Sequence, residues 1–293
     1  MHTIAVQKRG WLAAAGIALA LLWSVTPARA ASVKPCEPTK VATLYPGLAG
    51  TTITIGQDGT SLPFSYRDPS HPDQVIGADA DYARAVFACI GVPVKFEIAA
   101  WSGLLPAVAN RRIDVMWDTL YYTPERAKVV DFVLYSTAAD AGLVHKGNPK
   151  HLTSVDELCG TRALGGLGTI EIALLDKLSS QCTAAGKPAI DAITYTDRPS
   201  AWQMIETNRA DIMLGSAVIV QAIVAQKPDL LEDAFSFLPD IKVGAAVAKE
   251  RTELEHAMET AIAATQADGE MERIYVKYGL DPKLILPPQI LTK

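Results

Sequence analysis

The feature that most constrains the fold is a regular alternation of strand-like and helix-like segments from Thr51 onward. Residues 92–98 alternate apolar with polar residues, as a half-buried strand does, whereas residues 79–90 repeat apolar residues at helical spacing. The remaining expected strands are 53–55, 113–117, 162–166, 192–196 and 211–214, and the remaining expected helices are 102–112, 123–130, 169–181, 199–209, 218–226 and 253–278. Strands that alternate with helices form parallel sheets, so the sequence predicts an α/β fold.

Two extended apolar segments, 134–146 and 237–249, separate the halves of this pattern. If both connect two lobes, the chain leaves the first lobe near Thr137 and returns to it near Ile241. The expected domains are therefore lobe 1 over 31–137, lobe 2 over 138–240, and a return to lobe 1 with a C-terminal helix over 241–293. Two crossings make a hinge, and hinge closure around a ligand is the known use of such a layout.

Residues 1–30 predict a cleavable secretory signal. Lys8 and Arg9 precede an apolar run over 11–25, and Ala28-Arg29-Ala30 has the form of a cleavage site. The run is shorter than the roughly 20 residues that span a bilayer. Since the cleavage point carries no cysteine for a lipid anchor, we expect a soluble, non-lipidated protein of the periplasm.

Composition and motifs exclude several classes of protein. The 27 basic residues are outnumbered by 32 acidic ones, so no basic excess indicates binding to nucleic acid. The chain lacks the motifs of serine hydrolases, zinc proteases and phosphate-binding loops, and its five histidines show no metal-ligand spacing. We therefore expect no catalytic residues, no cofactor and no metal.

Four cysteines in an oxidising compartment allow three pairings. Cys159 and Cys182 flank one strand–loop–helix segment and form the favoured local pair, which leaves Cys36 to pair with Cys89. The alternative is that Cys89, on the apolar face of a helix, is a buried free thiol.

Arg126 is the first candidate for ligand binding. Thr123 is typical of a helix N-cap and Pro124 of the first helical position, so Arg126 stands in the first turn after a strand and a loop. Open α/β sheets bind ligands at the carboxyl ends of their strands, where a guanidinium can hold a carboxylate through two parallel hydrogen bonds. The alternative is a surface ion pair, for example with Asp131.

Further candidates lie at similar places. Thr169 follows Gly168 at a helix start, where its hydroxyl and the free backbone N–H groups favour an anion; the alternative is an ordinary N-cap. Asp118 follows an apolar strand and could balance an ammonium group, or lie exposed in a loop. Aromatic residues beside loops could line a pocket, although single aromatics belong more often to the core: Trp101, Trp117, Tyr121 and Tyr122.

Several short motifs occur in a fixed order from about Thr51 to Tyr278. They are Gly56-x-Asp58 with Pro63-Phe64, Ile76-Gly77-x-Asp79-x-Asp81, Trp101-Ser102-Gly103-Leu104-Leu105-Pro106, Ile113-Asp114-Val115, Thr123-Pro124-Glu125-Arg126 with Val130-Asp131-Phe132, Gly168-Thr169, and Asp268-Gly269. With these motifs the chain resembles the polar-amino-acid family of extracytoplasmic solute-binding proteins, the capture subunits of ABC importers.

This resemblance implies a two-lobed, periplasmic-binding-protein-like fold, in which each lobe is a mostly parallel sheet flanked by helices and two strands form the hinge. It implies a monomeric periplasmic component of an ABC importer that captures an amino acid or a related small carboxylate by hinge closure. The implied partners are this ligand and the permease and ATPase complex of the inner membrane.

The resemblance also assigns residues of the site. It makes Arg126 the carboxylate clamp and implies that Thr169 reaches the carboxylate from lobe 2. The residues that it places around the ligand in lobe 1 are Trp101, the loop from Asp58 to Ser61, Thr119 and Tyr121.

Two positions depart from the family pattern. Ser216 stands where relatives carry the aspartate that receives the α-ammonium, and Asp118 stands where many carry a small residue. Either Asp118 has taken over the ammonium, the interpretation we favour, or the ligand lacks a standard α-ammonium; some anion must meet a buried ammonium.

Two other functions on the same scaffold stay open, since a fold does not dictate a function. A dehydratase-type enzyme would need a positioned acid or base, for which Asp118, Glu171 and His145 are the candidates. A ligand-binding module that reports to a receptor would use the same pocket.

Overall fold

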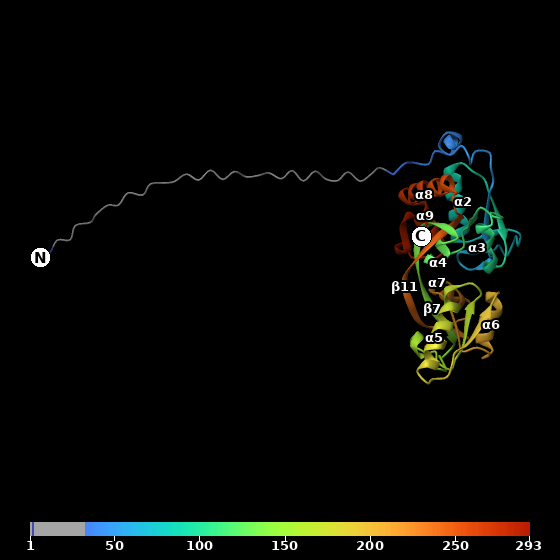
Figure 1. The fold of residues 1–293 in the computed structure, drawn as a ribbon, viewed down its shortest axis with the longest axis vertical. Helices are drawn as coiled ribbons and strands as arrows, with labels where there is room; N and C mark the ends of the chain where they lie inside the picture. Colours follow the sequence, from blue (N-terminus) through green and yellow to red (C-terminus); the bar gives the residue numbers. More distant parts are fainter. Residues whose placement is uncertain (1, 3–32) are drawn as a thin grey trace. The chain divides into compact units, whose positions relative to one another are not determined.

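The computed structural model describes His2 and residues 33–293 (Figure 1), and the predicted secretory signal, apart from His2, lies outside the described residues. The main sheet of this part has the order β5-β1-β6-β11-β7-β10-β8-β9, with β12 added beside β7. Its strands are β1 (Ile53–Gln57), β5 (Val94–Ile98), β6 (Val115–Met116), β7 (Val130–His145), β8 (Arg162–Gly166), β9 (Asp191–Tyr195), β10 (Ile212–Ser216), β11 (Leu231–Ala248) and β12 (Ile285–Leu291). A separate small sheet contains β2 (Thr60–Ser61), β3 (Ser65–Arg67) and β4 (Val75–Ile76).

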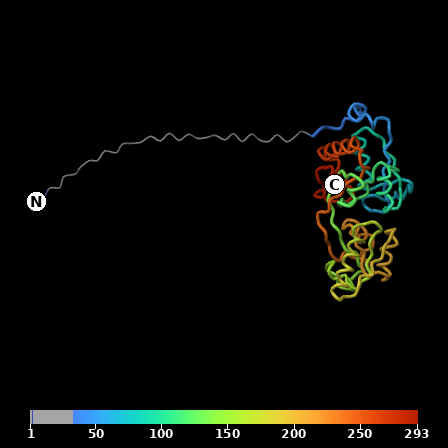
Figure 2. The backbone as a smooth tube through the Cα atoms, viewed as in Figure 1, coloured from blue at the N-terminus to red at the C-terminus, as the bar shows by residue number. Residues whose placement is uncertain are grey.

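The two long strands β7 and β11 pair antiparallel and join two groups of elements, as Figures 1 and 2 show. In lobe 1, β1 pairs parallel with β5 and β6; in lobe 2, β8 pairs parallel with β9 and β10. Each lobe is thus a mostly parallel sheet, and the predicted two-lobed α/β fold with a two-strand connection is confirmed.

The pairing of β7 with β11 is interrupted between Phe237 and Ile241. Leu238 and Asp240 there have positive φ angles of 44° and 62°, which make an irregularity in one strand. It lies opposite the stretch of β7 from Ala138 to Asp140. The domain boundaries at residues 137 and 240 stay a prediction, and this bulge is where the chain would change lobes.

Apart from α1, which was not expected, the helices follow the expected order, with ends displaced by a few residues. They are α1 (Val41–Leu44), α2 (Ala78–Ile90), α3 (Trp101–Ala109), α4 (Pro124–Ala127), α5 (Ile170–Ala184), α6 (Arg198–Glu206), α7 (Ala217–Gln226), α8 (Thr252–Ala267) and α9 (Glu270–Lys277). Two expectations were wrong. The helix expected over 253–278 is two helices, because Gly269 has a φ of +79° and breaks the helix. The helix expected over 123–130 ends at Ala127, because Val130 already begins β7.

A cluster of buried aromatic side chains packs in the core of lobe 1. Trp117, which follows β6, lies edge-on to Tyr82 of α2 with ring centroids 5.6 Å apart, and 5.3 Å from the ring of Tyr135 in β7. Trp117 is fully buried, so it belongs to the core and not to a pocket. This packing fixes the chain directly before Asp118 and Thr119.

Two disulfides tie loops to helices. Cys36 is bonded to Cys89 of α2, and Cys159 is bonded to Cys182 of α5, with S–S distances of 2.03 Å and 2.02 Å. These are the two pairs that the sequence favours, and Cys89 is therefore not a free thiol. Across the part of the chain that the structure describes, no helix combines the length and apolar character needed to cross a membrane.

Candidate ligand-binding site

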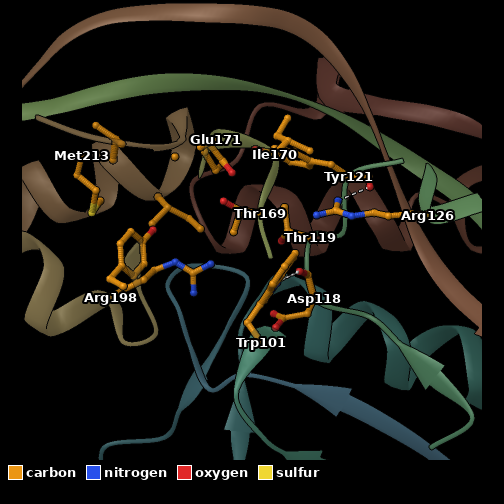
Figure 3. A pocket seen from close by; sticks show the side chains of 15 residues that line it. Trp101, Asp118, Thr119, Tyr121, Arg126, Thr169, Ile170, Glu171, Arg198 and Met213 are labelled. Atoms are coloured by element: carbon orange, nitrogen blue, oxygen red, sulfur yellow. Dashed lines mark hydrogen bonds between the residues drawn. The ribbon is translucent and has the colours of Figure 1, made fainter. Parts of the chain in front are cut away.

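A cavity lies between the lobes. Lobe 1 contributes side chains that follow β6, and lobe 2 contributes side chains that follow β8, β9 and β10, so the cavity lies at the carboxyl ends of parallel strands. The structure brings together there these residues that the sequence singled out: Trp101, Asp118, Thr119, Tyr121, Arg126, Thr169 and Ser216. Figure 3 shows this cavity.

Arg126 is held in place by neutral groups that leave its charge unpaired. The Thr123 hydroxyl caps α4 by accepting from the Arg126 backbone N–H at 3.2 Å. The guanidinium donates to the carbonyl of Tyr121 at 2.6 Å and, across the cavity, to the carbonyl of Gly168 at 3.0 Å. It also lies 5.3 Å from the ring centroid of Trp101. Its remaining N–H groups are available to an anion.

The expected alternative for Arg126, an ion pair with Asp131, does not occur. Asp131 accepts instead from the ammonium of Lys249 at 2.6 Å. Burial lowers the pKa of Arg126, but an arginine side chain stays charged at neutral pH. An unpaired, half-buried cation in a cavity favours a ligand that brings an anion.

The N-terminus of α5 faces the same cavity. The Thr169 hydroxyl donates to the carbonyl of Gly166 at 2.9 Å and does not cap the helix. Thr169, Ile170 and Glu171 all line the cavity, so the uncapped N–H groups of the first turn are close to it. A helix N-terminus attracts anions, and this one lines the same cavity as Arg126 from the other lobe.

Asp118 and Thr119 are already engaged within lobe 1. One oxygen of the buried Asp118 carboxyl accepts from the hydroxyl of Ser65, and the other accepts from the backbone N–H of Asp58 at 2.9 Å. Burial, and then the charge of Asp58, raises the pKa of Asp118 well above its ordinary value. The backbone N–H and hydroxyl of Thr119 donate to Asp79 at 2.6 Å and 2.8 Å. The polar side-chain atoms of both residues are thus already hydrogen-bonded within lobe 1, and both residues form part of the cavity wall.

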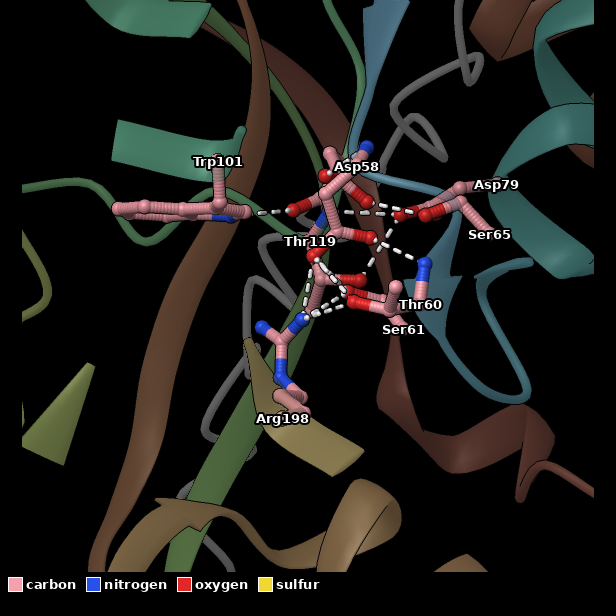
Figure 4. A network of polar contacts seen from close by, with 9 residues as sticks. Asp58, Thr60, Ser61, Ser65, Asp79, Trp101, Thr119 and Arg198 are labelled. Atoms are coloured by element: carbon pink, nitrogen blue, oxygen red, sulfur yellow. Dashed lines mark hydrogen bonds and ion pairs between the residues drawn. The ribbon is translucent and has the colours of Figure 1, made fainter. Parts of the chain in front are cut away.

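Asp58 and Ser61 do not line this cavity; they hold Arg198, which does (Figure 4). One guanidinium nitrogen of Arg198, at the start of α6, donates hydrogen bonds to the Asp58 carboxylate and to the Ser61 hydroxyl, the latter at 2.7 Å. Burial alone would lower the pKa of Arg198, but the charge of Asp58 raises it above its ordinary value. This ion pair joins lobe 2 to lobe 1.

Sequence reasoning did not identify Arg198 as a cavity residue, and it did not predict that Glu171 lines the cavity. A signal existed for Arg198, because Asp197-Arg198-Pro199 begins a helix shortly after strand β9, and Arg126 likewise lies in the first turn of a helix that follows a strand and a loop. Glu171 was named only as a candidate acid for an enzyme. Its position in the first turn of α5 was the signal that it shares a face with Thr169.

The other enzyme candidate, His145, is not in the cavity. It lies at the end of β7, where its ring is 3.1 Å from the carbonyl of Lys146. Within residues 33–293, no group of three acidic, histidine or cysteine side chains is arranged to hold a metal ion. Asp118 and Glu171 are thus the acids of that hypothesis that line the cavity.

Comparisons with known proteins agree with this architecture. Residues 53–281 match the family of bacterial extracellular solute-binding proteins, family 3. The L-cystine-binding protein TcyJ of Escherichia coli (strain K12) is 27% identical over 232 residues, which are 78% of this chain and 84% of that protein. The structure of an ancestral arginine-binding protein bound to arginine has 26% identity and a TM-score of 0.72, covering 78% of this chain and 97% of that one. The ancestral amino acid-binding protein AncCDT-1, a precursor of cyclohexadienyl dehydratase, has 29% identity and a TM-score of 0.65, covering 78% and 95%.

Proposed function

The chain belongs to the bacterial extracellular solute-binding proteins of family 3, and from this premise we propose that it is the periplasmic substrate-binding component of an ABC importer. Its ligand is an amino acid or a related small carboxylate. The observation that carries the proposal is the unpaired guanidinium of Arg126, which faces the uncapped N-terminus of α5 across a cavity lined by both lobes. Relatives named as cystine-binding and arginine-binding proteins support the ligand class.

The proposed mechanism is capture by closure. In the open protein, Arg126 and Trp101 of lobe 1 are accessible to the ligand. A carboxylate bound to Arg126 draws the N-terminus of α5 toward it, and closure forms contacts between the lobes such as that between Arg198 and Asp58. A ligand shifts such an equilibrium only by binding one state better, and here it contacts both lobes only in the closed state. The closed monomer then docks on the permease and ATPase complex in the inner membrane.

Exclusion of water strengthens the capture. Closure replaces water around the guanidinium with protein groups of lower polarity, and opposite charges attract more strongly in that environment. The cavity also contains apolar and aromatic surface from Trp101, Met213, Ile219 and Val220, which contacts the rest of the ligand. A carboxylate supplies the binding energy at one end, and this surface selects the side chain at the other.

A second candidate is a dehydratase-type enzyme, which the likeness to AncCDT-1 and the raised pKa of Asp118 favour. A carboxyl whose pKa is raised by burial holds its proton more tightly, and a general acid needs this property. Incubation with each compound that binds, followed by mass spectrometry, distinguishes the two functions: a binding protein returns its ligand unchanged, whereas an enzyme yields a product.

The test is a thermal-shift screen with amino acids, opines, polyamines and small carboxylates. A compound that binds only the native state stabilises it by about 2.7 kcal/mol at a concentration 100 times its Kd. We expect amino acids or carboxylates to raise the melting temperature of the wild type and of the control Arg209→Ala, an exposed arginine of lobe 2. We expect Arg126→Ala to stay folded and to bind at least about 100-fold more weakly, because charge-assisted hydrogen bonds contribute about 1.5–3 kcal/mol each. An Arg126→Ala protein with undiminished affinity would refute the assignment.

A further inference from the structure

The side of the cavity near lobe 2 contains acceptor atoms that the protein leaves without a partner. Glu171, Asp140 and Ser216 are 5%, 0% and 7% exposed. Among the described residues, one side-chain oxygen of each has no hydrogen-bond partner. More than about nine in ten buried polar groups in proteins are paired, so three neighbouring exceptions require an explanation. Glu171 and Ser216 line the cavity itself.

Asp140 stands behind this surface and is linked to it through Tyr121. The Tyr121 hydroxyl donates to one oxygen of Asp140 at 2.8 Å, while the other oxygen of Asp140 is free of protein partners. Burial, and then the negative charge of Glu171, raises the pKa of Asp140 to about 8. Two carboxyl groups therefore lie close together in a buried place, and neither has an ion-pair partner among residues 33–293. Such a place binds a donor with positive charge.

Glu171 is also placed correctly relative to the carboxylate site. Its charge acts on Arg126, so the two groups are electrostatic neighbours, although they form no ion pair. In an α-amino acid, the carboxylate and the ammonium are attached to the same carbon, and their binding groups must therefore be neighbours. Glu171 belongs to the first turn of α5, the helix whose N-terminus faces the carboxylate.

Asp118, the residue that the sequence favoured for the ammonium, is less suited to it. Both of its oxygens already accept hydrogen bonds from lobe 1, from Ser65 and from the Asp58 backbone. The charged groups that act most strongly on the pKa of Asp118 are Asp58, Arg198 and Asp79. Figure 3 shows Asp118 and Glu171 on opposite sides of the cavity.

We propose that Glu171, supported by Ser216 and by the Tyr121–Asp140 pair, receives the α-ammonium of the ligand. The substrate is therefore a zwitterionic α-amino acid and not a simple carboxylate. This inference rests on the proposed function, because it uses the carboxylate position set by Arg126. In this proposal, Glu171 of α5 and Asp140 of β7 supply the negative charge that relatives carry at the position of Ser216.

The experiment compares Glu171→Gln with the control Asp176→Asn, which removes a charge from the exposed side of the same helix. Isothermal titration uses the twenty standard L-amino acids and L-cystine, and for the tightest of them the analogue in which hydrogen replaces the amino group. We expect the wild type and Asp176→Asn to bind the amino acid at least about 100-fold more tightly than the analogue. Glu171→Gln should lower the affinity for the amino acid at least about 30-fold, and it should change the affinity for the analogue less than about threefold.

The outcomes separate this inference from the proposed function. Unchanged affinity of Glu171→Gln for the amino acid overturns the inference, as does a wild type that binds the analogue as tightly as the amino acid. Binding of simple carboxylates that depends on Arg126, without binding of any amino acid, also overturns the inference but leaves the carboxylate clamp intact. If none of these probes and no small carboxylate binds the wild type, the proposed function itself fails.

Discussion

Replacing Arg198 with methionine should weaken ligand binding by removing the ion pair that joins the lobes. The side chains of Arg198 and Asp58 are only 15% and 5% exposed. Removal of one partner of a buried ion pair destabilises by about 3–5 kcal/mol, because the other charge is left buried and uncompensated. In an open protein both groups are hydrated, so this loss falls on the closed state. Asp58 keeps its bonds from Thr60 and Ser61, and we therefore expect the lower end, about 3 kcal/mol, or a rise in Kd of about 100-fold.

A double-mutant cycle is needed because Arg198 also lines the cavity and could contact the ligand. Asp58→Asn keeps the turn formed with the Thr60 N–H, and combining it with Arg198→Met removes both charges. Isothermal titration of the four proteins should give a coupling free energy of about 2 kcal/mol between the two sites in ligand binding. X-ray scattering of the same samples should show a smaller ligand-induced contraction in each single variant. A coupling below about 0.5 kcal/mol would show that the pair does not stabilise the closed state.

Two further predictions concern stability. The Cys159→Ser/Cys182→Ser protein should lose about 3 kcal/mol of unfolding free energy in a denaturant titration, since the bond closes a loop with a sequence separation of 23; an unchanged unfolding midpoint would contradict this. Asp140 binds its proton more tightly in the folded state, at a pKa of about 8, so it destabilises the ligand-free protein increasingly from about pH 4 to pH 8. Asp140→Asn keeps an acceptor for Tyr121. Its melting temperature should therefore equal that of the wild type near pH 4 and exceed it at pH 9. Equal melting temperatures of variant and wild type at both pH values would refute the raised pKa of Asp140.

The order of strands and helices was predictable because periodicity is a local property. Residues 92–98 alternate, residues 79–90 repeat at helical spacing, and both patterns formed the expected elements. The C-terminal strand β12 was not predicted, because Pro287 and Pro288 interrupt its pattern and only its place beside β7 makes it a strand. The break at Gly269 carried a signal, since Asp268-Gly269 is typical of a helix end.

Part of the cavity lining was predictable from the sequence. The N-cap at Thr123 and the preceding strand and loop made Arg126 a candidate, the family resemblance made it the carboxylate clamp, and the structure places it in the cavity. The places of Glu171 and Asp140 depend on how α5 and β7 approach each other, which no local pattern contains. Likewise, Asp58 has the same sequence context whether it faces a ligand or an arginine of the other lobe.

A crystal structure of the protein with its tightest amino acid tests the central claim most directly. We predict that the ligand carboxylate lies within about 3.2 Å of both the Arg126 guanidinium and the backbone N–H groups that begin α5, and that the ammonium lies equally close to Glu171. A ligand whose carboxylate is bound to Arg198, with Arg126 still donating only to Tyr121 and Gly168, would contradict the account.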